Sequence, residues 1–480
     1  MEFSDSQAEL TILPRFSRTA GRARLVDQAL FWLFVGGLAW APFWYGGNAP
    51  IAWGINAILF PGLAVVYEIA TVLPGGRHPI AIRALAVPAG LFAAVVLWVA
   101  LQTATWAPDW FANPIWSMAA DALGKPLAAS ISVDRDLTAL ALVRLATAAS
   151  VFWLAVQLCR DGVRANRLIA AIAAIGWAYA AYGLIALKTG QIPWLDIPAP
   201  DGRVTSTFVN HNCYATYAGI GLIATAGLLV RLYQWGVAES GSWRLRLAAF
   251  IDTTGGEGAG LIAGGFVSLV ALLLTGSRGG VLSTGAGLAV LGVLALRRGR
   301  RRERRPVAAI AFVLGSVTAT LFVFGSLFAD NLGERGLADS NRMAVLLLTG
   351  RSILDAPLLG FGYGTFGDVF PMYRDRSISI AGAWAQAHDS YIENFQGLGL
   401  VFGGMLIAAL VLLALRCFRG AIQRQENATV PRVAAGVACL VGVHAAADFS
   451  LQMQAVALTF MAVLGAGVGQ ATSSRIEIGD

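Results

Sequence analysis

The chain has 480 residues, of which 57% are hydrophobic and only 13% are charged, and its mean hydropathy is +0.65. Apolar runs of about 20 residues, the length that a helix needs to cross a bilayer, recur along it. These properties exclude a soluble globular protein. The net charge of +7 follows from basic residues gathered on one side of the membrane, so we expect no nucleic-acid partner.

Apolar runs of this length form helices, because backbone polar groups in lipid must be paired within the chain. The sequence lacks the alternating pattern of membrane β-strands. We therefore predict an all-α, polytopic integral membrane protein with about 12 transmembrane helices. In chain order, the apolar segments cover residues 27–45, 50–70, 84–104, 138–158, 167–187, 211–230, 259–275, 280–296, 307–328, 391–415, 433–448 and 452–470.

Basic residues fix the orientation of these segments, since short cytoplasmic loops are enriched in arginine and lysine. With the N-terminus inside, ten of the 35 basic residues lie outside and Arg144 lies within a segment, which leaves 24 inside. The inside set includes seven arginines within residues 297–305, which we interpret as an anchor near anionic headgroups. The outside set is Lys125, Arg135, Lys188, Arg203, Arg278, Arg335, Arg342, Arg351, Arg374 and Arg376.

One membrane domain accounts for most of the chain. We predict a cytoplasmic N-terminal segment at 1–26, a transmembrane domain at 27–470 and a cytoplasmic tail at 471–480. Three outside loops are long, and they cover residues 105–137, 188–210 and 329–390.

The largest outside loop has a pattern of its own. Residues 340–354 predict an amphipathic helix, which Pro357 would end. The glycines that follow predict a flexible turn, and the helix and turn together would roof a cavity. These glycines are Gly360, Gly362, Gly364 and Gly367.

Two outside arginines stand out by position. Arg203 precedes the sixth segment, and Arg278 lies in a short glycine-flanked hairpin between the seventh and eighth segments. A charge that opposes the positive-inside bias indicates a bound anion, and guanidinium groups hold phosphate through paired, charge-assisted hydrogen bonds. The alternative is an interfacial arginine that snorkels to lipid headgroups.

His388 is one of only four histidines and lies where the largest outside loop meets the tenth apolar segment. A histidine there can exchange protons with a water-exposed hydroxyl. Asp389 follows it, and an adjacent carboxylate would raise the pKa of the imidazole. The alternative role of His388 is to cap a helix at the membrane boundary.

A second group competes with His388 for the role of base. His444, Asp448 and Gln452 are spaced four apart and would share one helical face near the outer end of the eleventh segment. We favour a structural or acceptor-orienting role for them. Arg144 would pair with a carboxylate inside the bundle or approach a lipid diphosphate, and Glu393 would orient His388 or pair with a basic residue.

The four cysteines fall in or next to apolar segments, with no close pair that would bind a metal or form a redox motif. We interpret them as small buried residues. His78 and His211 are interpreted as non-catalytic. We expect no metal and no cofactor.

Four patterns together resemble the O-antigen ligase and polymerase superfamily over roughly residues 137–470. The first runs from Gly202 or Ser206 to Phe208, Asn210 and Asn212. The second is Ser-Arg-Gly-Gly around Arg278. The other two consist of Arg342, Pro357, Gly360, Gly362 and Phe366, and of His388, Tyr391 and Glu393.

The resemblance implies a GT-C-type glycosyltransferase of the bacterial inner membrane whose active site faces the periplasm. Its donor would be a glycan on undecaprenyl diphosphate, and its acceptor the lipid A core or another glycan, with membrane lipids around both. Arg203, Arg278 and Arg342 would hold the diphosphate. His388 would take the acceptor proton during an inverting attack, without a metal.

Several functions remain compatible with the sequence. A ligase and a polymerase would share the donor and differ in the acceptor, and an O-linked protein glycosyltransferase is a further variant. A twelve-helix polysaccharide or lipid transporter is the alternative from another class. Transporters place ionisable residues near the midplane and have two related halves, whereas here only Arg144 lies near a midplane and the sequence has no internal repeat.

Overall fold

The computed structural model describes residues 18–73, 75–106, 108–192, 197–198, 202–236, 254–296, 340–378, 384–424 and 428–472. The predicted segment at 307–328, the arginine run at 297–305 and Arg335 lie outside these residues.

The described part of the chain is helical apart from one two-stranded antiparallel ribbon. Nine of its helices are long and apolar enough to cross a membrane, and shorter apolar helices cover Leu25–Trp40 and Thr429–Ala445. Each of the predicted segments other than 307–328 coincides with a helix. The prediction of an all-α, polytopic membrane protein is therefore confirmed.

The helices that form the bundle are α1 (Arg18–Trp40), α2 (Pro50–Val72), α3 (Ala86–Gln102), α5 (Arg135–Leu158), α6 (Gly162–Thr189), α7 (His211–Gly236), α9 (Ala259–Leu274), α10 (Arg278–Leu296), α14 (Ser390–Gln423), α15 (Thr429–Ala445) and α16 (Gln454–Ala471). The remaining elements are α4 (Ile115–Leu123), α12 (Ser340–Asp355), α13 (Phe366–Tyr373), the ribbon β1 (Gln191–Ile192) and β2 (Ile197–Pro198), the 3₁₀ turns η1 (Ile82–Leu85), η2 (Asp109–Phe111) and η4 (Ser450–Gln452), and the π turn η3 (Thr254–Gly258).

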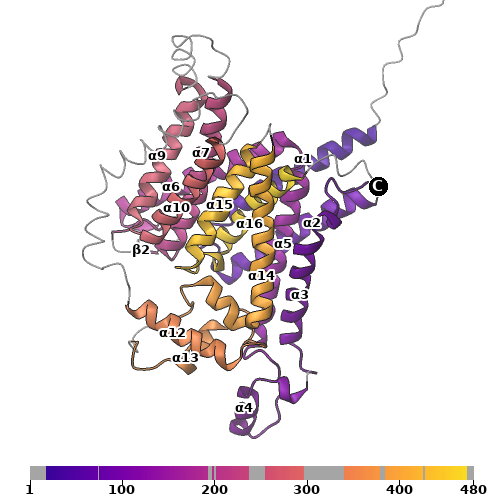
Figure 1. Cartoon of the computed structure of the whole chain (residues 1–480), viewed down its shortest axis with the longest axis vertical. Helices are drawn as coiled ribbons and strands as arrows, with labels where there is room; N and C mark the ends of the chain where they lie inside the picture. Colours follow the sequence, from indigo (N-terminus) through magenta and orange to yellow (C-terminus); the bar gives the residue numbers. More distant parts are fainter. Residues whose placement is uncertain are drawn as a thin grey trace, which may run out of the picture.

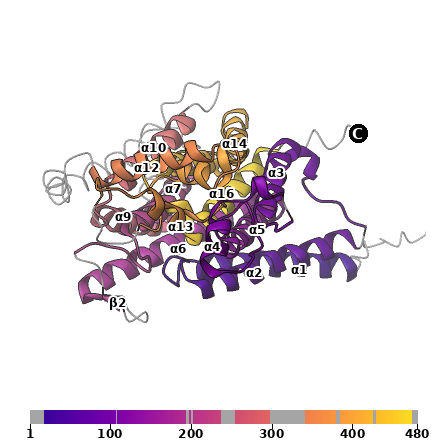
Figure 2. The ribbon, with the colours of Figure 1, turned by 90° about the horizontal axis from the view of Figure 1, so that it is seen from below.

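Two halves of the bundle flank a central pair of helices. Helices α7, α9 and α10 lie on one side, α2, α3 and α5 lie on the other, and α15 and α16 lie between them (Figures 1 and 2). Helices α4, α12 and α13 gather at one end, at the bottom of Figure 1. The long loop 105–137 therefore contains a helix, and α5 already begins at Arg135.

Helix α16 is buried along most of its length because small residues let its neighbours approach closely. A Cβ added at Gly465 would lie 2.6 Å from the carbonyl oxygen of Phe152, and one at Gly469 would lie 2.8 Å from that of Val156. Helices α10 and α15 meet in the same way at Gly287 and Gly436. Contacts between small residues of this kind hold helices together in lipid, where burial of apolar surface gives little driving force.

The amphipathic helix predicted in the largest loop is present as α12, which ends at Asp355, shortly before Pro357. The glycines that follow do not form the expected flexible turn. Gly360, Gly362 and Gly364 have positive φ, and a Cβ on any of them would meet neighbouring atoms. They are required where backbones pass within contact distance.

The segment 357–363 pairs with an interruption in α14. Helix α14 is broken at Gly399, where φ is 76° and ψ is 167°. The amide nitrogens of Phe361 and Gly362 donate to the carbonyl oxygens of residues 396 and 397 (3.0 and 3.1 Å), and that of residue 400 donates to Pro357 (2.8 Å). These bonds satisfy the backbone groups that the break would leave unpaired in lipid.

Gln102, at the end of α3, completes this junction and is fully buried. Its Nε2 donates to the carbonyl oxygens of Leu359 and Gly397, at 2.8 Å each, and its Oε1 accepts from the amide of Tyr363 at 3.1 Å. One side chain thus joins α3, the segment 357–363 and the start of α14.

Candidate functional site

The predicted site residues lie at the same end of the bundle as α12 and α13. Helices α7, α10 and α14 begin at this end and α15 finishes there, as their order along the chain requires. The amide of Val204 donates to the carbonyl of Leu274 at 3.0 Å, which joins the loop of Arg203 to the end of α9. Several helix N-termini at one end give it a positive potential.

Arg203 pairs with a histidine that we had interpreted as non-catalytic. Its Nη1 lies 3.1 Å from Nε2 of His211, the first residue of α7. The side chain of Asn210 caps this helix by accepting from the amides of Asn212 and Cys213, at 2.7 and 3.3 Å. Asn210 therefore has a structural role that explains its position in the pattern.

Arg278 is the first residue of α10 and follows the predicted hairpin, in which Gly276 has a positive φ. Ser277 caps the helix, because its Oγ accepts from the amide of Gly280 at 3.1 Å. The Nη1 atom of Arg278 is buried and has no hydrogen-bond partner among the described residues. A guanidinium at a helix N-terminus strengthens a potential that already favours anions.

The prediction that His444, Asp448 and Gln452 share one helical face is wrong. Helix α15 ends at Ala445, Asp448 lies in the following turn, and Gln452 ends η4. Helix α15 ends and helix α16 begins at the same end of the bundle, so the chain reverses its direction between them. The three residues nevertheless remain in one hydrogen-bonded group, because Ser450 bonds to His444 and Ser390 bonds to both Asp448 and Gln452.

His444 is enclosed by hydrogen bonds to α7 and η4. Its Nδ1 lies 2.5 Å from Oγ1 of Thr216 and 3.0 Å from Oγ of Ser450. A Cβ added at Gly279 would lie 3.1 Å from its Nε2, so the imidazole also contacts the first turn of α10. Only 2% of His444 is exposed, which favours the predicted structural role.

Asp448 is also buried, and its Oδ1 accepts from the amide of Phe449 at 2.6 Å. Burial raises the pKa of this carboxyl to about 6, although nearby Arg342 opposes the shift. Arg342 itself reaches the same turn from α12, because its Nη1 donates to the carbonyl of Ala447 at 3.3 Å. The amphipathic helix thus brings a positive charge to the reversal after α15.

His388 lies beside the same turn and remains half-buried. Its ring packs edge-on between Phe449, at 4.8 Å between centroids, and Trp384, at 5.4 Å. Its φ of 57° is unusual for a residue with a side chain, and such strain occurs at functional sites. The two candidate bases are therefore linked through consecutive residues, because His388 packs on Phe449 and His444 is hydrogen-bonded to Ser450.

Asp389 caps α14 through two hydrogen bonds of its side chain. Its Oδ1 accepts from the amides of Tyr391 and Ile392, at 2.8 and 3.0 Å. Glu393 supports the residue before His388, because its Oε2 accepts from the amide of Ala387 at 2.9 Å. Tyr391 fastens α14 to α15 through a 2.7 Å hydrogen bond to the carbonyl of Gly442.

Comparison with protein families identifies part of the chain. Residues 263–408 match the family model described as O-antigen ligase. This part of the chain is similar to the O-antigen ligase family. No curated protein matches the chain. The predicted resemblance to the O-antigen ligase and polymerase superfamily is therefore confirmed, and with it an enzyme family that acts on glycans.

The matched O-antigen ligase region contains Arg278, Arg342, His388, Tyr391 and Glu393. The other candidates lie outside this region of the sequence. They are Arg144, Arg203, Asn210, Asn212, His444 and Asp448.

Arg144 lies on α5 and reaches the reversal after α15 from the other side of the bundle. One of its Nη atoms donates to the carbonyl of Gln452, and its guanidinium stacks 4.9 Å from the ring of Trp53. It also lies near the carboxylate of Glu393. These contacts support the structural alternative for Arg144, which pairs with a carboxylate inside the bundle.

Sequence patterns did not reveal several polar residues that hold this end of the bundle together. Ser390 donates toward the carbonyl of Asp448 and toward Oε1 of Gln452, at 3.1 Å each. Thr216 donates to Ser450 at 2.8 Å. Their only signal in the sequence is that each is a polar residue next to an apolar run.

Proposed function

We propose that the protein transfers a glycan from undecaprenyl diphosphate to an acceptor hydroxyl at the periplasmic face of the bacterial inner membrane. Arg203 and Arg278 hold the diphosphate, Arg342 adds charge to the same end, and His388 accepts the proton. The family match supports a ligase or polymerase, and the donor, the acceptor and the roles of these residues are our proposal.

The observation that supports this most is the guanidinium of Arg278. Its Nη1 is buried without a hydrogen-bond partner in the described part of the chain, and such a group costs about 1–3 kcal/mol. The cost is offset when an anion binds, because a diphosphate oxygen accepts a charge-assisted hydrogen bond there. The N-terminus of α10 adds amide dipoles of the same sign.

The departing diphosphate needs its negative charge neutralised more than it needs a proton from an acid. The acceptor oxygen attacks the anomeric carbon, the bond from that carbon to the diphosphate oxygen breaks, and the electron pair leaves with the diphosphate. The hydroxyl proton passes to His388. Inversion follows from direct attack, and the leaving group requires no metal because arginines take up its charge.

His388 suits the role of base better than His444 does. His388 is half-buried beside Phe449 and Trp384 and is therefore accessible to a substrate. In contrast, Nδ1 of His444 is held by Thr216 and Ser450, and its Nε2 lies against α10. These contacts support our proposal that His388 transfers the proton and that His444 supports the reversal after α15.

Purified protein in nanodiscs tests the proposal with an undecaprenyl-diphosphate-linked glycan as donor. The acceptors are a lipid A core, a second molecule of the donor and a hydroxyl-bearing peptide, so that the product distinguishes a ligase, a polymerase and a protein glycosyltransferase. We expect His388→Ala to lower kcat at least 10³-fold, within the range of general base catalysis. Arg278→Lys should lower kcat/KM about 10- to 100-fold, because lysine lacks the paired donors.

His444→Ala is the matched control for His388→Ala. It should destabilise the protein but reduce turnover per folded molecule far less. Full activity in His388→Ala, or transfer that is lost when EDTA is added, would contradict the mechanism. Movement of the glycan across the membrane with no new glycosidic bond would indicate a transporter instead.

A further inference from the structure

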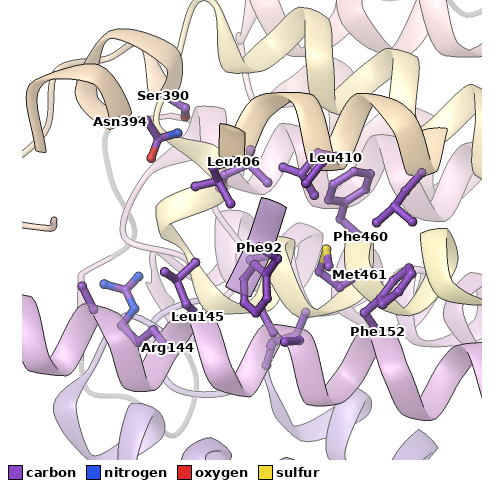
Figure 3. Close-up of a pocket in the computed structure, with 18 of the residues that line it drawn as sticks. Phe92, Arg144, Leu145, Phe152, Ser390, Asn394, Leu406, Leu410, Phe460 and Met461 are labelled. Atoms are coloured by element: carbon purple, nitrogen blue, oxygen red, sulfur yellow. The ribbon is translucent and has the colours of Figure 1, made fainter. Parts of the chain in front are cut away.

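A cavity of about 390 Å³ lies between α3, α5, α14 and α16. One end is polar and includes Arg144, Ser390 and Asn394, whereas Phe152 and Phe460 lie at the other end (Figure 3). The volume is within the range of small-molecule sites. The proposed mechanism does not use this cavity.

The cavity has the length and polarity of a site for one lipid chain. Its lining on α5 extends from Ala141 to Trp153, which is about 18 Å at 1.5 Å per residue. Half of the hydrocarbon core of a bilayer is about 15 Å. A chain in the outer leaflet would therefore fill the apolar part and leave its head at the polar end.

The polar end of the cavity is continuous with the cluster around His388. Ser390 and Gln452 line the cavity and are hydrogen-bonded to each other. Ser390 also donates toward the carbonyl of Asp448, and Asp448 precedes the Phe449 ring that packs on His388. A hydroxyl on a head at this end would thus lie near the proposed base.

Charge distinguishes this cavity from the proposed diphosphate site. The guanidinium of Arg144 already donates to the carbonyl of Gln452 and lies near the carboxyl of Glu393, which lines the same end of the cavity. The other polar groups there are amides and the hydroxyls of Tyr363 and Ser390, which suit a sugar or another neutral head. Arg203 and Arg278 belong to the half of the bundle formed by α7, α9 and α10. Helices α15 and α16 separate that half from α3 and α5, which line the cavity (Figures 1 and 2).

We propose that this cavity holds the hydrocarbon chain of a lipid-linked acceptor and presents the acceptor head to His388 from the side opposite the donor diphosphate. The identification of the bound lipid as an acceptor rests on the proposed transfer reaction. The binding of a chain can be tested without that reaction.

Two phenylalanine substitutions on α5 provide a matched pair. Ala149 lines the cavity, whereas Ala146 is exposed on the same helix and does not line it. Ala149→Phe fills part of the cavity, and Ala146→Phe places the same ring in the surrounding lipid. Ala409→Phe, on α14, fills the cavity from another side if Ala149→Phe does not fold.

Photolabelling measures binding directly in nanodiscs. The probes are an alkyl glucoside and a polyprenyl phosphate, each with a diazirine in its chain. We expect the glucoside to label peptides that contain Leu145 and Leu406, two cavity residues, and the labelling to fall at least fivefold in Ala149→Phe but not in Ala146→Phe. Labelling of these peptides by the polyprenyl phosphate alone, or equal labelling in both variants, overturns the proposal.

The transfer assay then identifies which substrate uses the cavity. Ala149→Phe should raise KM for a lipid-linked acceptor about tenfold and leave KM for the donor, and for the same acceptor without its lipid, unchanged. An increase in the KM of the donor overturns the assignment to the acceptor. Absence of transfer in the wild-type protein contradicts the proposed function, whereas the photolabelling still decides whether the cavity binds a chain.

Discussion

Nε2 of His444 lies against the backbone of Gly279, so closely that an added Cβ would come within 3.1 Å of it. The end of α15 therefore rests on the first turn of α10, directly beside Arg278. Through Thr216 and Ser450 the same imidazole is fixed to α7 and η4. Four elements from distant parts of the chain meet at this single ring.

Gly279→Ala is expected to displace His444 and the first turn of α10. The new methyl group would push the imidazole by a few tenths of an ångström, and Arg278 would move with its helix. We expect glycan transfer to fall several-fold, measured as kcat/KM in nanodiscs. Gly285→Ala is the control, because nothing lies within 4 Å of a Cβ there on the same helix; a similar loss in both variants would contradict the prediction.

The break in α14 should depend on the absence of a side chain at Gly399. Its φ of 76° is costly for alanine, and a Cβ there would meet the carbonyl oxygen of Leu358. Gly399→Ala should therefore destabilise the protein by about 1–3 kcal/mol, seen as a lower unfolding midpoint in detergent. Gly404→Ala, where a Cβ meets nothing within 4 Å, should leave the midpoint unchanged or raise it.

Gln102→Leu would remove the partner described above from the carbonyl of Leu359 and the amide of Tyr363, whereas the carbonyl of Gly397 keeps the amide of Gly362. Each such group costs about 1–3 kcal/mol, so we expect a clearly lower unfolding midpoint and reduced transfer by the protein that remains folded. Gln157→Leu is a matched control. Gln157 is equally buried and bonds the backbone of Ile80 through both of its side-chain ends, at 2.8 and 3.0 Å, near the other end of α5.

The control should lose stability but keep its turnover, because its contacts are remote from His388. Equal turnover in folded Gln102→Leu and in wild-type protein would show that the junction of segment 357–363 with α14 does not position the site.

Stability should fall with rising pH because of Asp448. Burial raises the pKa of its carboxyl from 3.8 to about 6, so the folded state keeps the proton that the unfolded state releases. The stabilisation is complete below about pH 4, is lost between about pH 4 and 6, and amounts to about 3 kcal/mol for a shift of this size. In Asp448→Asn, the unfolding midpoint should no longer change with pH over this range. If the midpoint of the variant has the same pH dependence as that of the wild-type protein, another group is responsible.

The sequence was sufficient to locate most of the helices because lipid imposes long, uninterrupted apolar runs. It also located the hairpin before Arg278 and the helix α12, since glycines and Pro357 mark their limits. The break at Gly399 was not predictable, because glycine is common inside transmembrane helices and only the distant segment 357–363 stabilises the interruption.

The relationship between the two candidate bases could not be predicted for a similar reason. A spacing of four suggests one helical face, but α15 ends at Ala445 because the chain must reverse before α16. The contact between His444 and Thr216 joins residues that are 228 positions apart. Local spacing contains no information about such a contact, and the same holds for the ring of Phe449 beside His388.

Segment 357–363 is bonded to the start of α14 on one side and to Gln102 of α3 on the other, while α12 and α13 continue from its two ends. A movement of α12 and α13 that admits a long polymer would strain these bonds and shift the first turn of α14 together with His388. The helices of the large loop and His388 are therefore mechanically coupled, so that a displacement of one is transmitted to the other.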